Sequence, residues 1–211
     1  MTPKQEAYAT QAQTIIENLK KRGMEGYYFA DAKSCLDYIL NMIPEGSTIS
    51  NGGSMTNQDI GIMDAIASPK YQFIDRMAPK TPEEKKQVYA KIVTADYFFM
   101  STNAITIDGE LINIDGAGNR VACLIHGPEN VMIVTGMNKV VTTVEEGINR
   151  AHNGAAVPNV KRLNKKTPCH ETGVCADCLS PDCICNHTVI TRRSGTPGRI
   201  KIFLIGEELG Y

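Results

Sequence analysis

Short apolar runs alternate with amphipathic stretches over most of the chain. Apolar residues at helical spacing predict helices at residues 3–22, 32–43, 57–67, 81–92, 121–125 and 143–152. Shorter aromatic or β-branched runs predict strands at residues 26–30, 47–50, 71–74, 97–100, 131–134 and 200–205. Because strands that alternate with helices usually pair in parallel, we expect an α/β fold, with a mainly parallel sheet and helices on both of its faces.

A β-hairpin is predicted at residues 105–114, where Asp108 and Gly109 stand between two apolar, isoleucine-rich runs. A two-residue turn of type I′ needs positive φ at both central positions, and glycine adopts that conformation without strain. We expect this hairpin to be an antiparallel addition to the parallel sheet.

Length and composition change this picture only slightly. The chain has 211 residues, of which 42% are apolar, so it can form one sizeable core; we expect a single domain over residues 1–211 with a cysteine-rich appendage at residues 161–187. A formal charge of −1 gives no basic surface for nucleic acid or for an anionic membrane. No apolar run approaches the roughly 18 residues of a membrane span, and no signal peptide is evident, which predicts a cytoplasmic protein.

Two glycine-rich loops directly follow predicted strands, at residues 51–56 and 115–120. Because ligands of open α/β sheets bind beyond the carboxyl ends of the strands, we expect both loops to line one cleft that takes a small anionic ligand. Glycines allow close approach to the ligand, while helix N-terminal amides and Arg120 supply donors. The candidate ligand-binding residues are Gly52, Gly53, Ser54, Thr56, Asn113, Asp115, Gly116, Gly118, Asn119 and Arg120.

Each loop also has a purely structural interpretation. The second can be a tight turn with a surface arginine, Ser54 can be a plain helix cap, and Asp115 can cap its own turn. Because side chains alternate along a strand, Asn113 and Asp115 share a face that Glu110 does not. The histidines form no Ser-His-Asp or Cys-His constellation, and Cys123, on an apolar helical face, is expected in the core.

Five of the seven cysteines crowd into residues 169–185. In a reducing compartment such crowding favours a metal centre over disulfides, and four thiolates suit either an iron–sulfur cluster or structural zinc. The basic run at residues 158–168 would offset the thiolate charge. Free or redox-labile thiols are the alternative, and His170 or His187 can replace one cysteine as a ligand.

Several long motifs carry a family resemblance, at residues 108–121, 161–169, 173–178 (Gly-Val-Cys-Ala-Asp-Cys), 184–186 and 206–210. With these motifs the chain resembles the lactate utilization (LUD) domain family over nearly its whole length. The resemblance implies the fold shared by glucosamine-phosphate deaminase, ribose-5-phosphate isomerase and CoA transferases. It also implies a set of metal ligands, which is Cys169, Cys175, Cys178 and Cys185. Cys183 stands where the family pattern has an arginine.

The resemblance implies a role in oxidising L-lactate or a related organic acid, as a redox or assembly subunit beside iron–sulfur oxidoreductase partners. The alternative is a small-molecule enzyme of the isomerase or acyl/CoA transferase type, which binds a phosphate or carboxylate at the glycine loops. The fold leaves the reaction and its catalytic residues open, because one fold hosts many chemistries.

Overall fold

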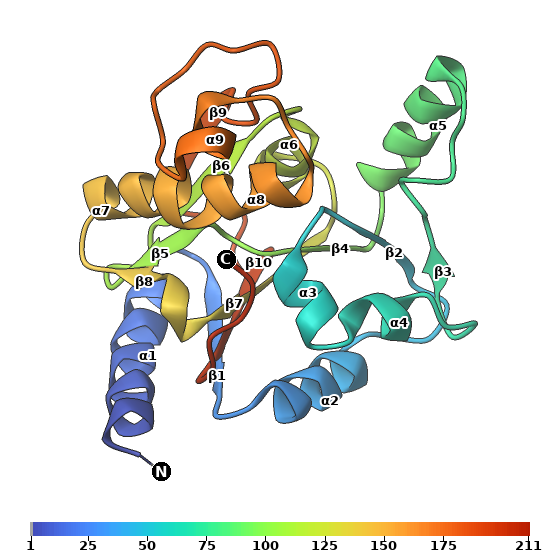
Figure 1. The fold of residues 1–211 in the computed structure, drawn as a ribbon. Coiled ribbons are helices and arrows are strands. Elements are labelled where there is room, and N and C mark those ends of the chain that lie inside the picture. Colours follow the sequence, from blue (N-terminus) through green and yellow to red (C-terminus); the bar gives the residue numbers. More distant parts are fainter. Residues whose placement is uncertain (1) are drawn as a thin grey trace.

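Six parallel strands form the larger sheet of the computed structural model, which describes residues 2–211 (Figure 1). Their spatial order is β1-β10-β7-β4-β2-β3, with every neighbouring pair parallel. The strands are β1 (Glu25–Phe29), β2 (Thr48–Asn51), β3 (Gln72–Phe73), β4 (Tyr97–Met100), β7 (Asn130–Gly136) and β10 (Ile200–Ile205). The predicted α/β fold with a mainly parallel sheet is confirmed.

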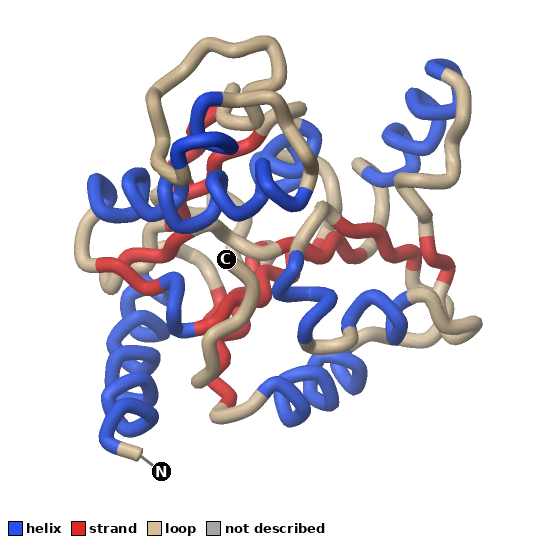
Figure 2. Tube along the Cα trace, in the orientation of Figure 1, coloured by secondary structure: helices blue, strands red, loops and turns tan. Residues whose placement is uncertain are grey.

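Helices cover both faces of this sheet (Figure 2). Alternation along β4 places Phe98 on one face and Phe99 on the other, so each face has its own apolar cluster. The first cluster includes residues of α1 (Pro3–Lys21), α5 (Pro82–Ile92) and α6 (Asn119–Ile125). The second includes residues of α2 (Ala32–Met42) and α4 (Ile62–Ile66). Cys123 of α6 is fully buried in the first cluster, as expected.

The hairpin forms as predicted but belongs to a second sheet, in the order β8-β5-β6-β9, rather than to the parallel one. Its strands are β5 (Ala104–Thr106) and β6 (Leu111–Asp115), flanked by β8 (Val140–Val141) and β9 (His187–Thr191). The type I′ turn is wrong, because of the two central residues only Gly109 has positive φ (88°). Thr106 and Glu110 instead close a three-residue loop, with the Thr106 amide donating to the Glu110 carbonyl at 2.9 Å.

Two predicted helices have different limits. The helix expected at residues 57–67 is two short helices, α3 (Met55–Asp59) and α4, because Gly61 adopts φ of 79° between them. The helix expected to end near residue 152 continues from α7 (Val144–Asn149) through a π-helical stretch, η2 (Arg150–Ala156), into α8 (Val157–Arg162). Pro158, which has no N–H group to donate to the preceding turn, lies where the π-helical stretch passes into α8.

The cysteine-rich region has little regular structure. It begins with α9 (Pro168–Thr172) and then runs as a long loop to β9 (Figure 2). β9 was not predicted, because its only apolar residues are Val189 and Ile190 and most of its side chains are exposed. No helix within residues 2–211 combines the length and apolar content needed to cross a membrane.

Candidate functional site

A pocket of about 350 Å³ lies beyond the carboxyl ends of β2, β4 and β7. Both glycine-rich loops reach it, with Gly53 and Ser54 following β2 and residues 115–120 following β6. Small residues of η2, including Ala155 and Ala156, line the side formed by the helix. The structure therefore brings the two loops together in one pocket, as the sequence predicted.

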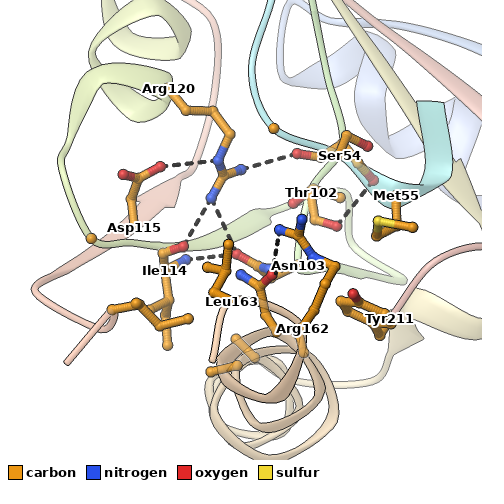
Figure 3. A pocket seen from close by; sticks show the side chains of 18 of the residues that line it. Ser54, Met55, Thr102, Asn103, Ile114, Asp115, Arg120, Arg162, Leu163 and Tyr211 are labelled. Atoms are coloured by element: carbon orange, nitrogen blue, oxygen red, sulfur yellow. Dashed lines mark hydrogen bonds and ion pairs between the residues drawn. The ribbon is translucent and has the colours of Figure 1, made fainter. Parts of the chain in front are cut away.

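Arg120 is the centre of a buried hydrogen-bond network at one wall of this pocket (Figure 3). Its side chain is 12% exposed, and all five of its N–H groups donate to protein oxygens. Burial lowers the pKa of Arg120, and the paired carboxylate of Asp115 opposes that effect. The acceptors are Asp115 Oδ2 (3.0 Å), Ser101 O (3.0 Å), Asn113 Oδ1 (2.6 Å), Asn103 Oδ1 (3.3 Å) and Ile114 O (2.9 Å).

The structural interpretations of the two loops hold for several residues. Asp115 caps its own turn by accepting from the Gly118 amide at 2.7 Å, so this amide is not free for a ligand. Ser54 caps α3 by accepting from the Asn57 amide at 3.1 Å. Arg120 likewise has no free donor, so a ligand would have to displace one of its protein acceptors.

The loop glycines allow close packing within the protein. A Cβ atom on Gly52 would lie 2.9 Å from Cγ of Arg120, and one on Gly116 would lie 3.3 Å from Cα of Ile184. Gly118 has φ of 82°, which favours glycine, and stands directly before α6. These glycines thus let Arg120 and the cysteine-rich segment approach the loops.

Lys139 is a buried cation in the same pocket, and it was not among the predicted residues. It ends the 3₁₀ turn η1 (Met137–Lys139) directly after β7 and is 3% exposed. Its Nζ donates to Thr56 Oγ1 at 2.8 Å and to Ser101 Oγ at 3.1 Å. Burial lowers its pKa to about 7, reinforced by Arg150 and opposed by Asp59. Within residues 2–211 it forms no ion pair.

Two further arginines make the pocket strongly cationic. The buried Nε atom of Arg76 has no hydrogen-bond partner in the described part of the chain. Arg162 reaches the pocket from α8, and within residues 2–211 its guanidinium group donates hydrogen bonds only to Asn159 Oδ1, from Nε at 3.1 Å and from Nη2 at 2.8 Å. Figure 3 shows it across the pocket from Arg120. Among residues 2–211, Asp115 is the one acidic side chain that lines the pocket, and it is already paired with Arg120.

Position beyond the carboxyl end of a strand, which predicted the glycine loops, also identifies Lys139. It stands just after a buried strand, as does the polar segment 101–103 after β4. Arg76 carries a weaker signal, because it follows the short strand β3. Arg162 had no such signal, since its place depends on a helix that continues past its predicted end.

The remaining predicted residues fall around the pocket rather than in it. Thr56 and Asn113 are both buried. Thr56 accepts a hydrogen bond from Lys139, and Asn113 accepts one from Arg120. The Nδ2 atom of Asn113 has no partner among residues 2–211. Glu110 points elsewhere, as predicted, and pairs with Arg22 of the C-terminal end of α1 at 2.8 Å.

The five crowded cysteines are all free. Cys169, Cys175 and Cys183 lie near Cys185, and Cys178 lies near Cys183. Burial raises the pKa of Cys185 to about 12, and the neighbouring thiols of Cys183, Cys175 and Cys169 add to that effect. In residues 2–211, however, no three His, Cys, Asp or Glu side chains are arranged so that they could hold a metal ion. The predicted ligand set therefore stays a prediction.

Comparisons with known proteins agree with the fold. The family model described as LUD domain matches residues 12–205. The curated proteins gave no match. The crystal structure of a DUF162 family protein from Deinococcus radiodurans is similar over 94% of this chain and 98% of its own, with a TM-score of 0.52 and 13% identity.

Two other solved structures have lower scores. One is eIF2B delta from Chaetomium thermophilum, with a TM-score of 0.35, 14% identity and coverage of 68% of this chain and 54% of its own. The other is a D-ribose-5-phosphate isomerase in complex with phospho-erythronic acid, with a TM-score of 0.34, 11% identity and coverage of 64% and 66%.

Proposed function

The chain belongs to the LUD domain family, and from that premise we propose that it takes part in oxidising L-lactate or a related organic acid, which it binds as an anion in the pocket. The observation that carries the proposal is the charge of the pocket. Arg76 and Arg162 line it without any carboxylate paired to them in the described chain. An anion would satisfy these cations, because a hydrogen bond to an ionised acceptor is roughly twice as strong as a neutral one.

The same charge supports a second candidate function, an enzyme of the isomerase or acyl/CoA transferase type that binds a phosphate. A monocarboxylate such as lactate carries one negative charge, whereas Arg76 and Arg162 present two guanidinium charges to the pocket with no carboxylate paired to them in the described chain. A phosphate monoester carries close to two charges at neutral pH and offers three oxygens, which suits such a set more fully.

Calorimetric titration with L-lactate and with a sugar phosphate tests both candidates. We expect Arg76→Gln and Arg162→Gln each to weaken binding of the preferred anion by about tenfold or more, the scale of one hydrogen bond to a charged group. Lys21→Gln is the matched control, because Lys21 lies at a separate basic surface hollow. Binding that is equally tight in all three variants, or absent for both anions, would count against the pocket.

A cysteine-bound metal centre is the further part of this proposal. Sulfur donors suit an iron–sulfur cluster, which supplies one-electron transfer, or zinc, which would hold the segment in place. Cys169, Cys175, Cys178 and Cys185 would hold it. The thiols around Cys185 include Cys169 and Cys175 of this set, together with Cys183. The loop after α9 would have to close further to bring in Cys178, since no group of three ligands in residues 2–211 is arranged to hold a metal ion.

Metal analysis of anaerobically prepared protein tests this part. We expect iron or zinc in the parent, its loss in Cys175→Ser and its retention in the matched control Cys183→Ser, because Cys183 is the expected spare thiol. Loss of metal should expose the loop to proteolysis while the α/β core stays folded, since the loop buries few large apolar side chains. Metal lost only in Cys183→Ser would contradict the assignment.

A further inference from the structure

Lys139 differs from an ordinary anion-binding lysine in its surroundings. It is 3% exposed, it lines the pocket, and the groups within hydrogen-bond distance of Nζ are the hydroxyls of Thr56 and Ser101. Two hydroxyls can accept from an ammonium, and they can equally donate to a neutral amine. No carboxylate in the described chain is paired with Nζ to hold it in the charged form.

The electrostatic setting favours the neutral amine. Burial is the largest of the causes that together lower the pKa of Lys139 to about 7. The positive charges of Arg150 and Arg120 act in the same direction, and the negative charge of Asp59 opposes them. Desolvation and a nearby cation are the two means by which enzymes turn a lysine into a nucleophile near neutral pH.

We propose that Lys139 forms an imine with a small aldehyde or ketone that carries an acidic group, held by the cations of the pocket. The inference deepens the proposed function and rests on its claim that the pocket binds an organic anion. Arg76 and Arg162 would bind the acidic group, while Nζ lies in the same pocket to meet the carbonyl carbon. Carboxylate and phosphate both fit this requirement.

The chemistry balances without an oxidant or a reductant. The lone pair of the neutral Nζ forms a bond to the carbonyl carbon, and the carbonyl π electrons move to oxygen. One proton passes from nitrogen to that oxygen to give a carbinolamine. The C–O bond then breaks, and the oxygen departs as water after it takes the second proton from nitrogen. The nitrogen lone pair forms the C=N bond.

Reduction with borohydride converts such an imine to a stable secondary amine and therefore tests the proposal. The probes are two aldehydes: glyoxylate, which carries a carboxylate, and glyceraldehyde 3-phosphate, which carries a phosphate. In the wild-type protein we expect peptide mapping by mass spectrometry to find the reduced adduct on Lys139 far above any other lysine. The probe that labels more efficiently identifies the acidic group.

Lys139→Met should lose this adduct, whereas Lys201→Met should keep it. Lys201 is a fair control because its side chain is also largely buried, at 15% exposed, but donates to Asn130 away from the pocket. Because the mapping is done on the wild-type protein, the test stands even if Lys139→Met does not fold.

Calorimetry with L-lactate, which has no aldehyde or ketone group to form an imine, separates the two claims. An adduct spread evenly over surface lysines, or none on Lys139 while lactate or phosphate esters bind, would overturn the imine and leave the anion site standing. Absence of both binding and adduct would overturn both.

Discussion

Replacing Arg120 with alanine should lower the free energy of unfolding by roughly 3–5 kcal/mol, the usual cost of removing one partner from a buried ion pair. The side chain is 12% exposed and joins the carboxylate of Asp115, two asparagine side chains and two main-chain carbonyls. Without it, these acceptors stay buried with fewer donors. Arg120→Lys should also be costly, because a single ammonium cannot reproduce the planar fork of donors.

Chemical denaturation of the parent and the variants measures this effect. Arg162→Ala is the matched control: it removes an exposed arginine from the same pocket, and we expect a change of at most about 0.5 kcal/mol. A small loss of stability in Arg120→Ala together with a large loss of anion affinity would contradict the structural role and make Arg120 a ligand-binding residue.

The stability of the protein should rise with pH between about 7 and 10.5 because of Lys139. Its pKa is lowered by burial to about 7 from 10.5, so within this window the unfolded chain binds a proton that the folded protein does not. Stability rises with pH wherever the unfolded state binds more protons. The contribution of Lys139 to the free energy of unfolding does not change with pH below this window, where Lys139 is charged in both states, or above it, where Lys139 is neutral in both.

The expected contribution is on the order of 2–5 kcal/mol, from about 1.4 kcal/mol for each pH unit by which the pKa differs. Unfolding free energies measured at several pH values for the parent and for Lys139→Met give it as the difference in slope. The rise should persist in Lys201→Met, in which Lys139 is intact. An identical slope in Lys139→Met and the parent would show that Lys139 is not the group that titrates.

The sequence predicted the elements that local patterns determine. Helix caps such as Thr81, apolar runs such as residues 97–100 and the Asp108-Gly109 turn all act over a few residues, and each lies where it was expected. The sheet to which the hairpin belongs was not predictable in this way. It depends on pairing with β8 and β9, and β9 lacks an apolar face.

The pocket was predictable in position but not in chemistry. Strand ends locate it, yet the role of Arg120 depends on five acceptors that the fold brings together. Burial of Lys139 likewise follows from packing, because a lysine in sequence gives no sign of its exposure. Arg120, whose donors are all bonded to protein oxygens, was therefore predicted from the sequence, whereas Lys139 was not.

A crystal structure with a bound organic anion tests the central claim, that this pocket binds an anion, most directly. We expect the acidic group within hydrogen-bond distance of Arg76 and Arg162, with Arg120 still bound to Asp115. An anion found only at the separate basic hollow of Lys21, Arg192 and Arg193, with the pocket holding none, would contradict the account.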